Sequence, residues 1–234
     1  MKISIIIPCY NEKDTINEIV KKVRNADVLH CEKEIIVIDD NSNDGTSTIL
    51  DELKKNFAIA KLIKNSKNQG KGFSIKEGIK NSNGDIIIIQ DADLEYDPND
   101  YNKLLEPILD GYADAVYGSR FLGSSRVRVL YFWHRVGNFI LTFLSNMFSN
   151  LNLTDMEVCY KAFKSSVLKN INLKENRFGF EPEVTAKLSK VRNLRLYEVS
   201  VSYYGRKYSE GKKITWKDGF SALRCILIYN LFND

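Results

Sequence analysis

Apolar residues dominate three short segments, at 3–8, 34–39 and 84–90. These runs are rich in isoleucine and valine and do not alternate with polar residues, which is typical of strands covered on both faces of a parallel sheet. Between and after the first two, apolar residues recur at helical spacing over 15–25 and 46–56. The pattern predicts a strand–helix–strand–helix order.

The alternation continues with a strand at 60–64, a glycine-rich turn at 68–72 and a helix at 74–80. We therefore expect an α/β fold of Rossmann-like type, an open, mostly parallel sheet with helices on both faces. Ligands of such folds bind beyond the carboxyl ends of the strands. The length of 234 residues predicts a single domain over 1–234.

The second half of the chain has a different texture. Basic and aromatic residues are interleaved over 126–135, and an apolar stretch follows over 139–153. Two interpretations stay open for this segment: a helix that packs on the core with a solvated basic face, or a helix that lies on a membrane surface. Beyond it, the pattern predicts a helix at 184–190 and a strand at 194–204, and a final helix follows from residue 215.

Composition limits the classes of protein. The net charge of +4, with Lys and Arg scattered among almost as many Asp and Glu, does not favour a nucleic-acid partner. The cysteines have no metal-ligand spacing, which favours a reducing, cytosolic setting. The first apolar run is too short for a signal peptide, and no run reaches the roughly 18 residues of a spanning helix. We expect a soluble or peripheral protein.

Polar and acidic side chains follow three of the predicted strands, at 8–12, 39–45 and 90–93. In a parallel sheet these clusters meet at one edge, where a nucleotide would bind. Asp91 and Asp93 offer oxygen ligands that suit Mg²⁺ or Mn²⁺, whose shell substrate phosphates would complete. The structural alternative is that such residues only cap helices and form turns.

Several enzyme classes lack their motifs here. No Gly-x-Gly-x-x-Gly follows the first strand, and no Walker-type phosphate loop is present, which argues against a nicotinamide dehydrogenase or a P-loop phosphotransferase. The chain has two histidines and no Gly-x-Ser-x-Gly, which argues against a serine hydrolase.

Four motifs in order, at 4–12, 37–46, 68–72 and 91–93, resemble the family 2 inverting glycosyltransferases, which have the GT-A fold. The resemblance is strong over about the first 120 residues. Segments 118–120 and 153–163, with a basic loop that includes Lys212 and Lys213, are similar to the dolichyl- or polyprenyl-phosphate hexosyltransferase branch. Cys159 departs from the glycine of many members, and many members carry transmembrane helices.

This resemblance implies roles on the donor side. It implies that Asp91 and Asp93 hold the diphosphate with Mg²⁺ or Mn²⁺, and that Asp40 hydrogen-bonds the base. An exposed surface lysine is the alternative for Lys71. The residues implied to bind the nucleotide sugar are Pro8, Tyr10, Glu12, Asp40, Lys71 and Asp91.

Roles on the acceptor side depend on the acceptor. A lipid phosphate is already anionic and needs no strong base, whereas guanidinium groups match its oxygens. The resemblance places Asp155 near the acceptor, where it would take a proton from a hydroxyl or orient a cation beside a phosphate; Glu157 competes for this role. The residues implied to bind the acceptor phosphate are Arg120, Arg126, Arg135 and Arg206, and the implied catalytic residues are Asp93, Arg120 and Asp155.

The expected function is transfer of a hexose, with inversion, from a nucleotide sugar of UDP-glucose or GDP-mannose type to a polyprenyl or dolichyl phosphate. We expect a peripheral protein at the cytoplasmic face of a membrane. Residues 1–120 would bind the donor, and 121–234, with amphipathic helices, the acceptor. The alternatives are a family 2 enzyme that acts on a sugar hydroxyl in polysaccharide or glycolipid synthesis, and a binding module without turnover.

Overall fold

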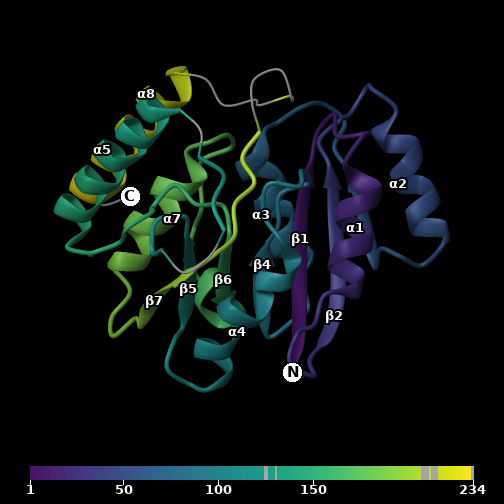
Figure 1. Cartoon of the computed structure of the whole chain (residues 1–234), viewed down its shortest axis with the longest axis horizontal. Coiled ribbons are helices and arrows are strands. Elements are labelled where there is room, and N and C mark those ends of the chain that lie inside the picture. The colour runs from purple at the N-terminus through teal and green to yellow at the C-terminus, as the bar shows by residue number, and fades with distance from the viewer. Residues whose placement is uncertain (124–125, 130, 207–210, 212–215, 233–234) are drawn as a thin grey trace.

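The fold is built on a seven-stranded sheet with the strand order β3-β2-β1-β4-β6-β5-β7 (Figure 1). The computed structural model describes residues 1–123, 126–129, 131–206, 211 and 216–232, so Lys212 and Lys213 lie outside the described residues. The strands are β1 (Lys2–Cys9), β2 (Glu32–Asp39), β3 (Lys61–Lys64), β4 (Ile86–Ile89), β5 (Ala115–Ser119), β6 (Lys161–Lys164) and β7 (Leu196–Ser200). The predicted open, mostly parallel α/β sheet is confirmed.

Helices connect the strands and cover the sheet. The β1-α1-β2 and β3-α3-β4 connections run in opposite directions across the sheet, so right-handed crossovers place α1 and α3 on opposite faces. The helices are α1 (Ile16–Asn25), α2 (Thr46–Lys55), α3 (Lys71–Asn81), the short η1 (Pro98–Asp100), α4 (Tyr101–Leu109), α5 (Phe132–Ser149), α6 (Ser165–Leu168), α7 (Phe180–Ser189) and α8 (Trp216–Leu231).

One strand runs against the others and joins the two halves of the chain. β6 pairs antiparallel with both β4 and β5. An antiparallel strand begins where its parallel neighbours end, so residues 155–160, which lead into β6, lie at the carboxyl edge of β4 and β5. The carboxyl end of β7, which is parallel to β5, leads to the same edge. Residues far apart in sequence therefore meet at one edge.

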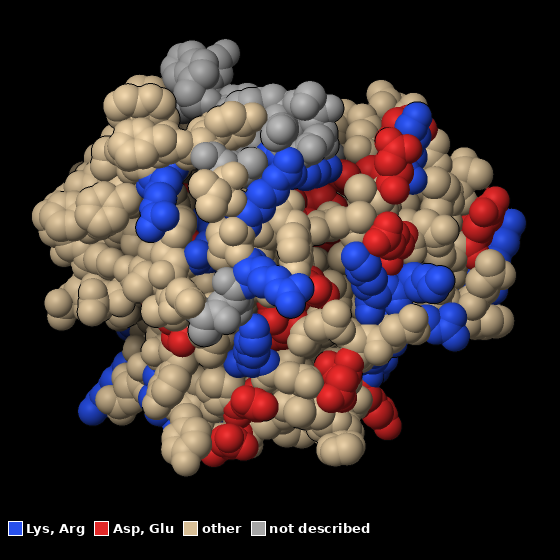
Figure 2. All heavy atoms as spheres, in the orientation of Figure 1, with Lys and Arg blue, Asp and Glu red and all other residues tan. Residues whose placement is uncertain are grey.

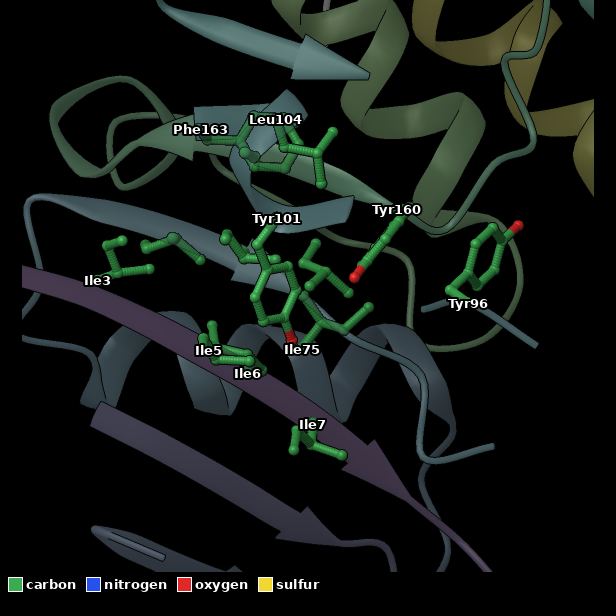
Figure 3. Packing of buried hydrophobic residues seen from close by; sticks show 14 of the residues in the cluster. Ile3, Ile5, Ile6, Ile7, Ile75, Tyr96, Tyr101, Leu104, Tyr160 and Phe163 are labelled. Carbon is green, nitrogen blue, oxygen red and sulfur yellow. The ribbon is translucent and has the colours of Figure 1, made fainter. Parts of the chain in front are cut away.

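The core beneath this edge is aliphatic at its centre and aromatic toward the edge. All four isoleucines of β4 are buried, as are Ile5 and Ile6 of β1. Tyr160 packs between Tyr96 and Tyr101, with ring centroids 5.1 Å and 5.8 Å away (Figure 3). The Tyr101 hydroxyl donates to Gln90 Oε1 at 2.9 Å. This packing supports the loop that follows β4.

The structure differs from the predicted elements mainly in the second half. The helix predicted from residue 184 begins at Phe180, because Pro182 falls in its first turn, where a backbone N–H has no partner within the helix. The strand expected over 194–204 is shorter in the structure, where β7 spans Leu196–Ser200. α5 packs on the core through Leu141, Leu144 and Phe148, and exposes Arg135 together with an apolar face. Among the described helices, none combines the length and apolar character needed to cross a bilayer.

Gly78 allows α3 to pack directly on β1, and this contact yields a test of the fold. A Cβ at Gly78 would lie 2.3 Å from Ile6 Cγ2. We expect Gly78→Ala to lower the free energy of unfolding by about 1–3 kcal/mol, the usual cost of overpacking a core. Urea unfolding followed by circular dichroism measures this change.

Gly137 is the matched control, since it is also helical but an added Cβ there meets no atom within 4 Å. Gly137→Ala should leave stability unchanged or raise it by up to about 1 kcal/mol. Equal stability changes in the two variants would contradict the described α3–β1 packing.

Candidate active site

A cavity of about 320 Å³ opens at the carboxyl edge of the sheet. Nine of the residues assigned a binding or catalytic role from the sequence line it, from the end of β1, from loops that follow β1, β2, β4, β5 and β7, and from the first turn of α3. They are Pro8, Tyr10, Glu12, Asp40, Lys71, Asp91, Asp93, Arg120 and Arg206. The sheet topology thus brings the predicted donor-side residues and two of the predicted acceptor-side arginines into one cavity.

Lys71 neutralises the first carboxylate of the Asp91-Ala92-Asp93 motif. Its Nζ lies 2.9 Å from Asp91 Oδ1 and 3.1 Å from Glu181 Oε1, and it also contacts the Cys159 thiol. Burial opposes the charge of both partners, but their mutual attraction outweighs it, so the pKa of Asp91 is lowered and that of Lys71 is raised. Lys71 is therefore a largely buried cation of the cavity wall, with 14% of its side chain exposed, rather than an exposed surface lysine.

Arg206 pairs with Asp93, the second carboxylate of the motif. Its Nη2 donates to Asp93 Oδ2 at 2.8 Å, and its Nη1 donates to Glu12 Oε2 at 3.2 Å. Glu95 is a third acidic neighbour, with Oε1 3.7 Å from Arg206 Nε. Burial, followed by repulsion from Asp91 and Glu95, raises the pKa of Asp93 to about 7 despite this arginine. One guanidinium thus holds three carboxylates together.

The carboxylates offer the ligand chemistry of a hard divalent cation. Among the described residues, no group of three or more His, Cys, Asp and Glu side chains is arranged to hold a metal ion. Mg²⁺ is commonly held by only one or two carboxylates together with substrate phosphates. Asp91 and Asp93 fit that pattern, with a bound diphosphate supplying the remaining oxygens. In this structure Lys71 and Arg206 provide the positive charge beside them.

Asp40 holds the glycine-rich turn that precedes α3. Its carboxylate accepts hydrogen bonds from the backbone N–H groups of Gln69 and Gly70, the latter at 2.7 Å, and from Asn65 Nδ2 at 2.7 Å. Gly70 has φ +99°, and a Cβ there would lie 2.5 Å from the Asn176 carbonyl oxygen, so only glycine fits. Asp40 therefore shapes the cavity wall in addition to any contact with a base.

Arg120 enters the cavity from the end of β5, and Asp155 fixes its orientation. Arg120 Nε donates to Asp155 Oδ2 at 2.6 Å and Nη2 donates to Oδ1 at 2.7 Å, a bidentate pair. Asn138 of α5 bridges the two, accepting from Arg120 Nη2 at 3.0 Å and donating to Asp155 Oδ1 at 3.2 Å. Asp155 is fully buried and does not line the cavity. Its position is that of a residue that orients a cation.

Glu157 is the acidic residue of the same segment that does line the cavity. Its Oε1 is buried and lacks a hydrogen-bond partner among the described residues. Burial and the nearby Glu181 carboxylate raise the pKa of Glu157 to about 8. A carboxyl group in this state is available to a ligand, as a proton donor when neutral or as a base when ionised.

The remaining predicted arginines lie outside the cavity lining, and other residues take part in it. Arg126 and Arg135 are exposed, and the Arg135 guanidinium lies 5.3 Å from the Phe121 ring centroid, which Arg120 also approaches, at 5.6 Å. Glu95, Arg177 and Tyr203 line the cavity but were not among the predicted site residues. For Glu95 the signal was present, since it continues the spacing of two set by Asp91 and Asp93.

Comparison with known proteins identifies the family. Residues 4–171 match Glycosyl transferase family 2, and the chain belongs to this family. It is 34% identical over 136 residues to the dolichol-phosphate mannosyltransferase of Pyrococcus furiosus, a match that spans 58% of this chain and 38% of that protein. It is 28% identical over 246 residues to the UDP-N-acetylglucosamine–dolichyl-phosphate N-acetylglucosaminyltransferase of Methanococcus voltae, with 98% and 96% of the two chains covered.

Solved structures agree on the fold. The crystal structure of glucosyl-3-phosphoglycerate synthase from Mycobacterium tuberculosis, in complex with Mn²⁺, uridine diphosphate and phosphoglyceric acid, superposes with a TM-score of 0.73 at 16% identity. The match covers all of this chain and 80% of that chain. The predicted GT-A fold and the predicted family are confirmed, and the protein is a glycosyltransferase enzyme.

The buried pair of Arg120 and Asp155 predicts a large stability effect. Asp155→Asn keeps the shape of the side chain but leaves the Arg120 charge without its counter-ion in the interior. We expect a loss of about 3–5 kcal/mol in the free energy of unfolding, measured by urea denaturation.

Asp51→Asn provides the comparison, because Asp51 pairs with Lys64 at 2.8 Å on the exposed surface. That variant should lose no more than about 1 kcal/mol. A small loss in Asp155→Asn, similar to that in Asp51→Asn, would show that Arg120 does not depend on Asp155.

Proposed function

We propose that this enzyme transfers a hexose, with inversion, from a nucleotide sugar of UDP-glucose or GDP-mannose type to a polyprenyl or dolichyl phosphate. The acceptor would be met at the cytoplasmic face of a membrane. The observation that carries the proposal is that a rigidly held guanidinium, Arg120, shares one cavity with the carboxylates Asp91 and Asp93. A donor diphosphate and an acceptor phosphate each find a suitable group in that cavity.

On the donor side, Pro8, Tyr10, Glu12 and Asp40 would bind the nucleoside, near the carboxyl ends of β1 and β2. Asp91 and Asp93 would hold Mg²⁺ or Mn²⁺, which would neutralise charge on the departing diphosphate. Lys71 and Arg206 already balance these carboxylates at 2.9 Å and 2.8 Å. They would turn toward phosphate oxygens when a diphosphate enters, since both side chains carry several donors.

On the acceptor side, Arg120 would bind the lipid phosphate and aim one of its oxygens at the anomeric carbon. This oxygen would form the new bond to carbon while the bond from carbon to the diphosphate oxygen breaks, and the electron pair would leave with the diphosphate. Attack from the opposite side inverts the anomeric configuration. Because a phosphate is already anionic, no side chain has to remove a proton. Asp155 would position Arg120, and Arg126 and Arg135 would attract the phosphate from outside the cavity.

Two relatives support this choice of acceptor. The Pyrococcus furiosus protein is named for transfer to dolichol phosphate, and the Methanococcus voltae protein for transfer to dolichyl phosphate. The second matches nearly the whole of this chain, including the segments that carry Arg120, Asp155 and Arg206. We further propose that residues 1–120 serve the donor and 121–234 the acceptor.

The direct test is incorporation of label from UDP-sugars and GDP-mannose into the organic phase of membranes loaded with polyprenyl phosphate, with Mg²⁺ or Mn²⁺. We expect lipid labelling that requires the metal and falls at least about 100-fold in Asp93→Ala. Donor hydrolysis without lipid labelling would retain the glycosyltransferase and reject the lipid acceptor.

Arg120→Lys tests the acceptor site while keeping a positive charge beside Asp155. Lysine cannot form the bidentate contact with Asp155 that fixes the position of the cation. We therefore expect the KM for the lipid acceptor to rise about 10- to 100-fold, with little change in the KM for the donor. Arg195→Lys is the matched control, since Arg195 makes the same forked contact with Asp114 on the exposed surface. An equal rise for donor and acceptor would remove Arg120 from the acceptor site.

One observation favours a second candidate, transfer to a sugar hydroxyl. Such an acceptor must lose a proton, and Glu157 lines the cavity with an unpartnered carboxyl oxygen. Asp155 is less suited to this role, because Arg120 and Asn138 engage both of its oxygens.

The pH dependence of the rate separates the two candidates. With the pKa of Glu157 at about 8, a Glu157 base would be mostly protonated at neutral pH. The rate would then rise roughly tenfold per pH unit up to pH 8 and level off above it, and Glu157→Gln would abolish it. Transfer to a lipid phosphate predicts no rise that depends on Glu157. Ionisation of Asp93 would make the rate level off near pH 7 rather than pH 8, and the Glu157→Gln enzyme would keep its activity within a few-fold.

A further inference from the structure

Helix α5 buries polar side chains and leaves several large apolar side chains exposed. Its two buried side chains are polar, Thr142 at 4% and Ser145 at 1% exposure, while the half-buried Leu141, Leu144 and Phe148 pack against the core. Asn146 also faces inward and hydrogen-bonds the backbone of Leu153. Its outward side carries large apolar side chains, with Trp133 at 76%, Phe139 at 68% and Phe143 at 57% exposure. A helix of a soluble protein normally places these two classes the other way round.

The exposed apolar side chains form one continuous stripe. Phe139, Phe143 and Met147 follow each other at intervals of four residues, and Phe132, Trp133 and Ile140 lie beside them. We call these six residues the α5 stripe. The left side of the molecule, over α5 and α8, is mostly uncharged in Figure 2, whereas acidic and basic side chains gather at the centre and right. An apolar surface of this kind marks an interaction site.

The charged residues near the α5 stripe indicate which partner binds it. Residues 121–150 contain no Asp or Glu, but they contain Arg126, Arg128 and Arg135. Arg135 is exposed in the first turn of α5, two residues after Trp133, and Arg126 is exposed in the segment that precedes the helix. Basic residues next to exposed aromatic ones suit the interface of a bilayer that contains anionic lipids. We propose that the α5 stripe docks on the surface of such a bilayer, with the helix lying in the interface.

A second copy of the chain fits the same surface less well. A two-fold contact would place the stripe and its arginines against the identical segment. That segment offers no carboxylate to pair with them. Phosphate groups of lipids supply the missing negative charge.

Docking of the α5 stripe would bring the proposed active site to its lipid acceptor. This role in catalysis rests on the proposed function. Asn138, on the inward side of α5, hydrogen-bonds both Arg120 and Asp155. The helix that meets the bilayer thus carries on its other side a direct contact to the proposed phosphate-binding arginine. Docking would hold the cavity close to the lipid headgroups, from which a polyprenyl phosphate has to be reached.

Vesicle flotation of the full chain tests the proposal without donor or acceptor. Vesicles are made of phosphatidylcholine alone or of an equimolar mixture with phosphatidylglycerol. We expect the wild type to bind the mixed vesicles, and Phe139→Ser/Phe143→Ser to bind them at least about tenfold more weakly, because two phenyl rings no longer enter the interface. Arg135→Gln should weaken binding to mixed vesicles by about fivefold and not change binding to the neutral ones.

Phe57→Ser is the matched control. Phe57 is 92% exposed in the turn after α2, at the opposite end of the molecule from α5 (Figure 1). This variant should bind vesicles like the wild type. Equal binding by all of these proteins would overturn the proposal, and so would a wild-type dimer in sedimentation equilibrium that Phe139→Ser/Phe143→Ser converts to a monomer.

The vesicle test and the transfer test fail separately. Transfer to a water-soluble short-chain prenyl phosphate needs no membrane, so Phe139→Ser/Phe143→Ser and wild type should catalyse it at the same rate. This transfer would therefore persist even if the α5 stripe did not dock. If the protein docks but no prenyl phosphate is labelled, the acceptor assignment is wrong and the membrane surface stands.

Discussion

Repulsion among carboxylates at the end of β4 is the constraint on which the site depends. Asp91, Asp93 and Glu95 come within five residues of chain, and the fold adds Glu12 from the end of β1. Buried like charges cost several kcal/mol unless cations are supplied. Lys71 and Arg206 supply them from opposite parts of the sequence, before and after the carboxylates. Arg206 lies in the second half of the chain and pairs with Asp93 and Glu12 of the first half. These ion pairs therefore form only when the two halves fold together and assemble the cavity.

This arrangement would suit the proposed ligand, a donor diphosphate. A pocket with only cations would hold the product diphosphate too firmly, whereas a pocket with only carboxylates would repel the donor. Paired charges let phosphate oxygens exchange partners with Asp91 and Asp93 instead of entering an unbalanced field. The same logic applies on the proposed acceptor side, where Asp155 holds the Arg120 charge in place.

The sequence predicts the fold well as far as β4, because the information there is local; it gives no prediction for α4 and β5. Continuous apolar runs mark buried parallel strands, and polar residues directly after them must meet at the carboxyl edge. β6 escaped prediction because it has only four residues and begins and ends with lysine, one of which, Lys161, is fully buried. The sequence also leaves the role of Asp155 open, because that role depends on a contact with a residue distant in the chain. Whether it faces a ligand or holds a cation depends on Arg120, 35 residues away in the chain.

The orientation of α5 shows the same limit and also explains its exposed apolar side. An amphipathic pattern defines two faces of a helix but not which one turns inward. Here Asn138 on the inward face hydrogen-bonds both Arg120 and Asp155, and so uses donors and acceptors that the ion pair itself leaves unpaired. Rotating the helix to bury Phe139 and Phe143 would remove Asn138 from that buried pair and put aromatic rings against it. The ionic requirement of the cavity therefore determines the orientation of the helix, and the apolar side is left facing outward as a consequence.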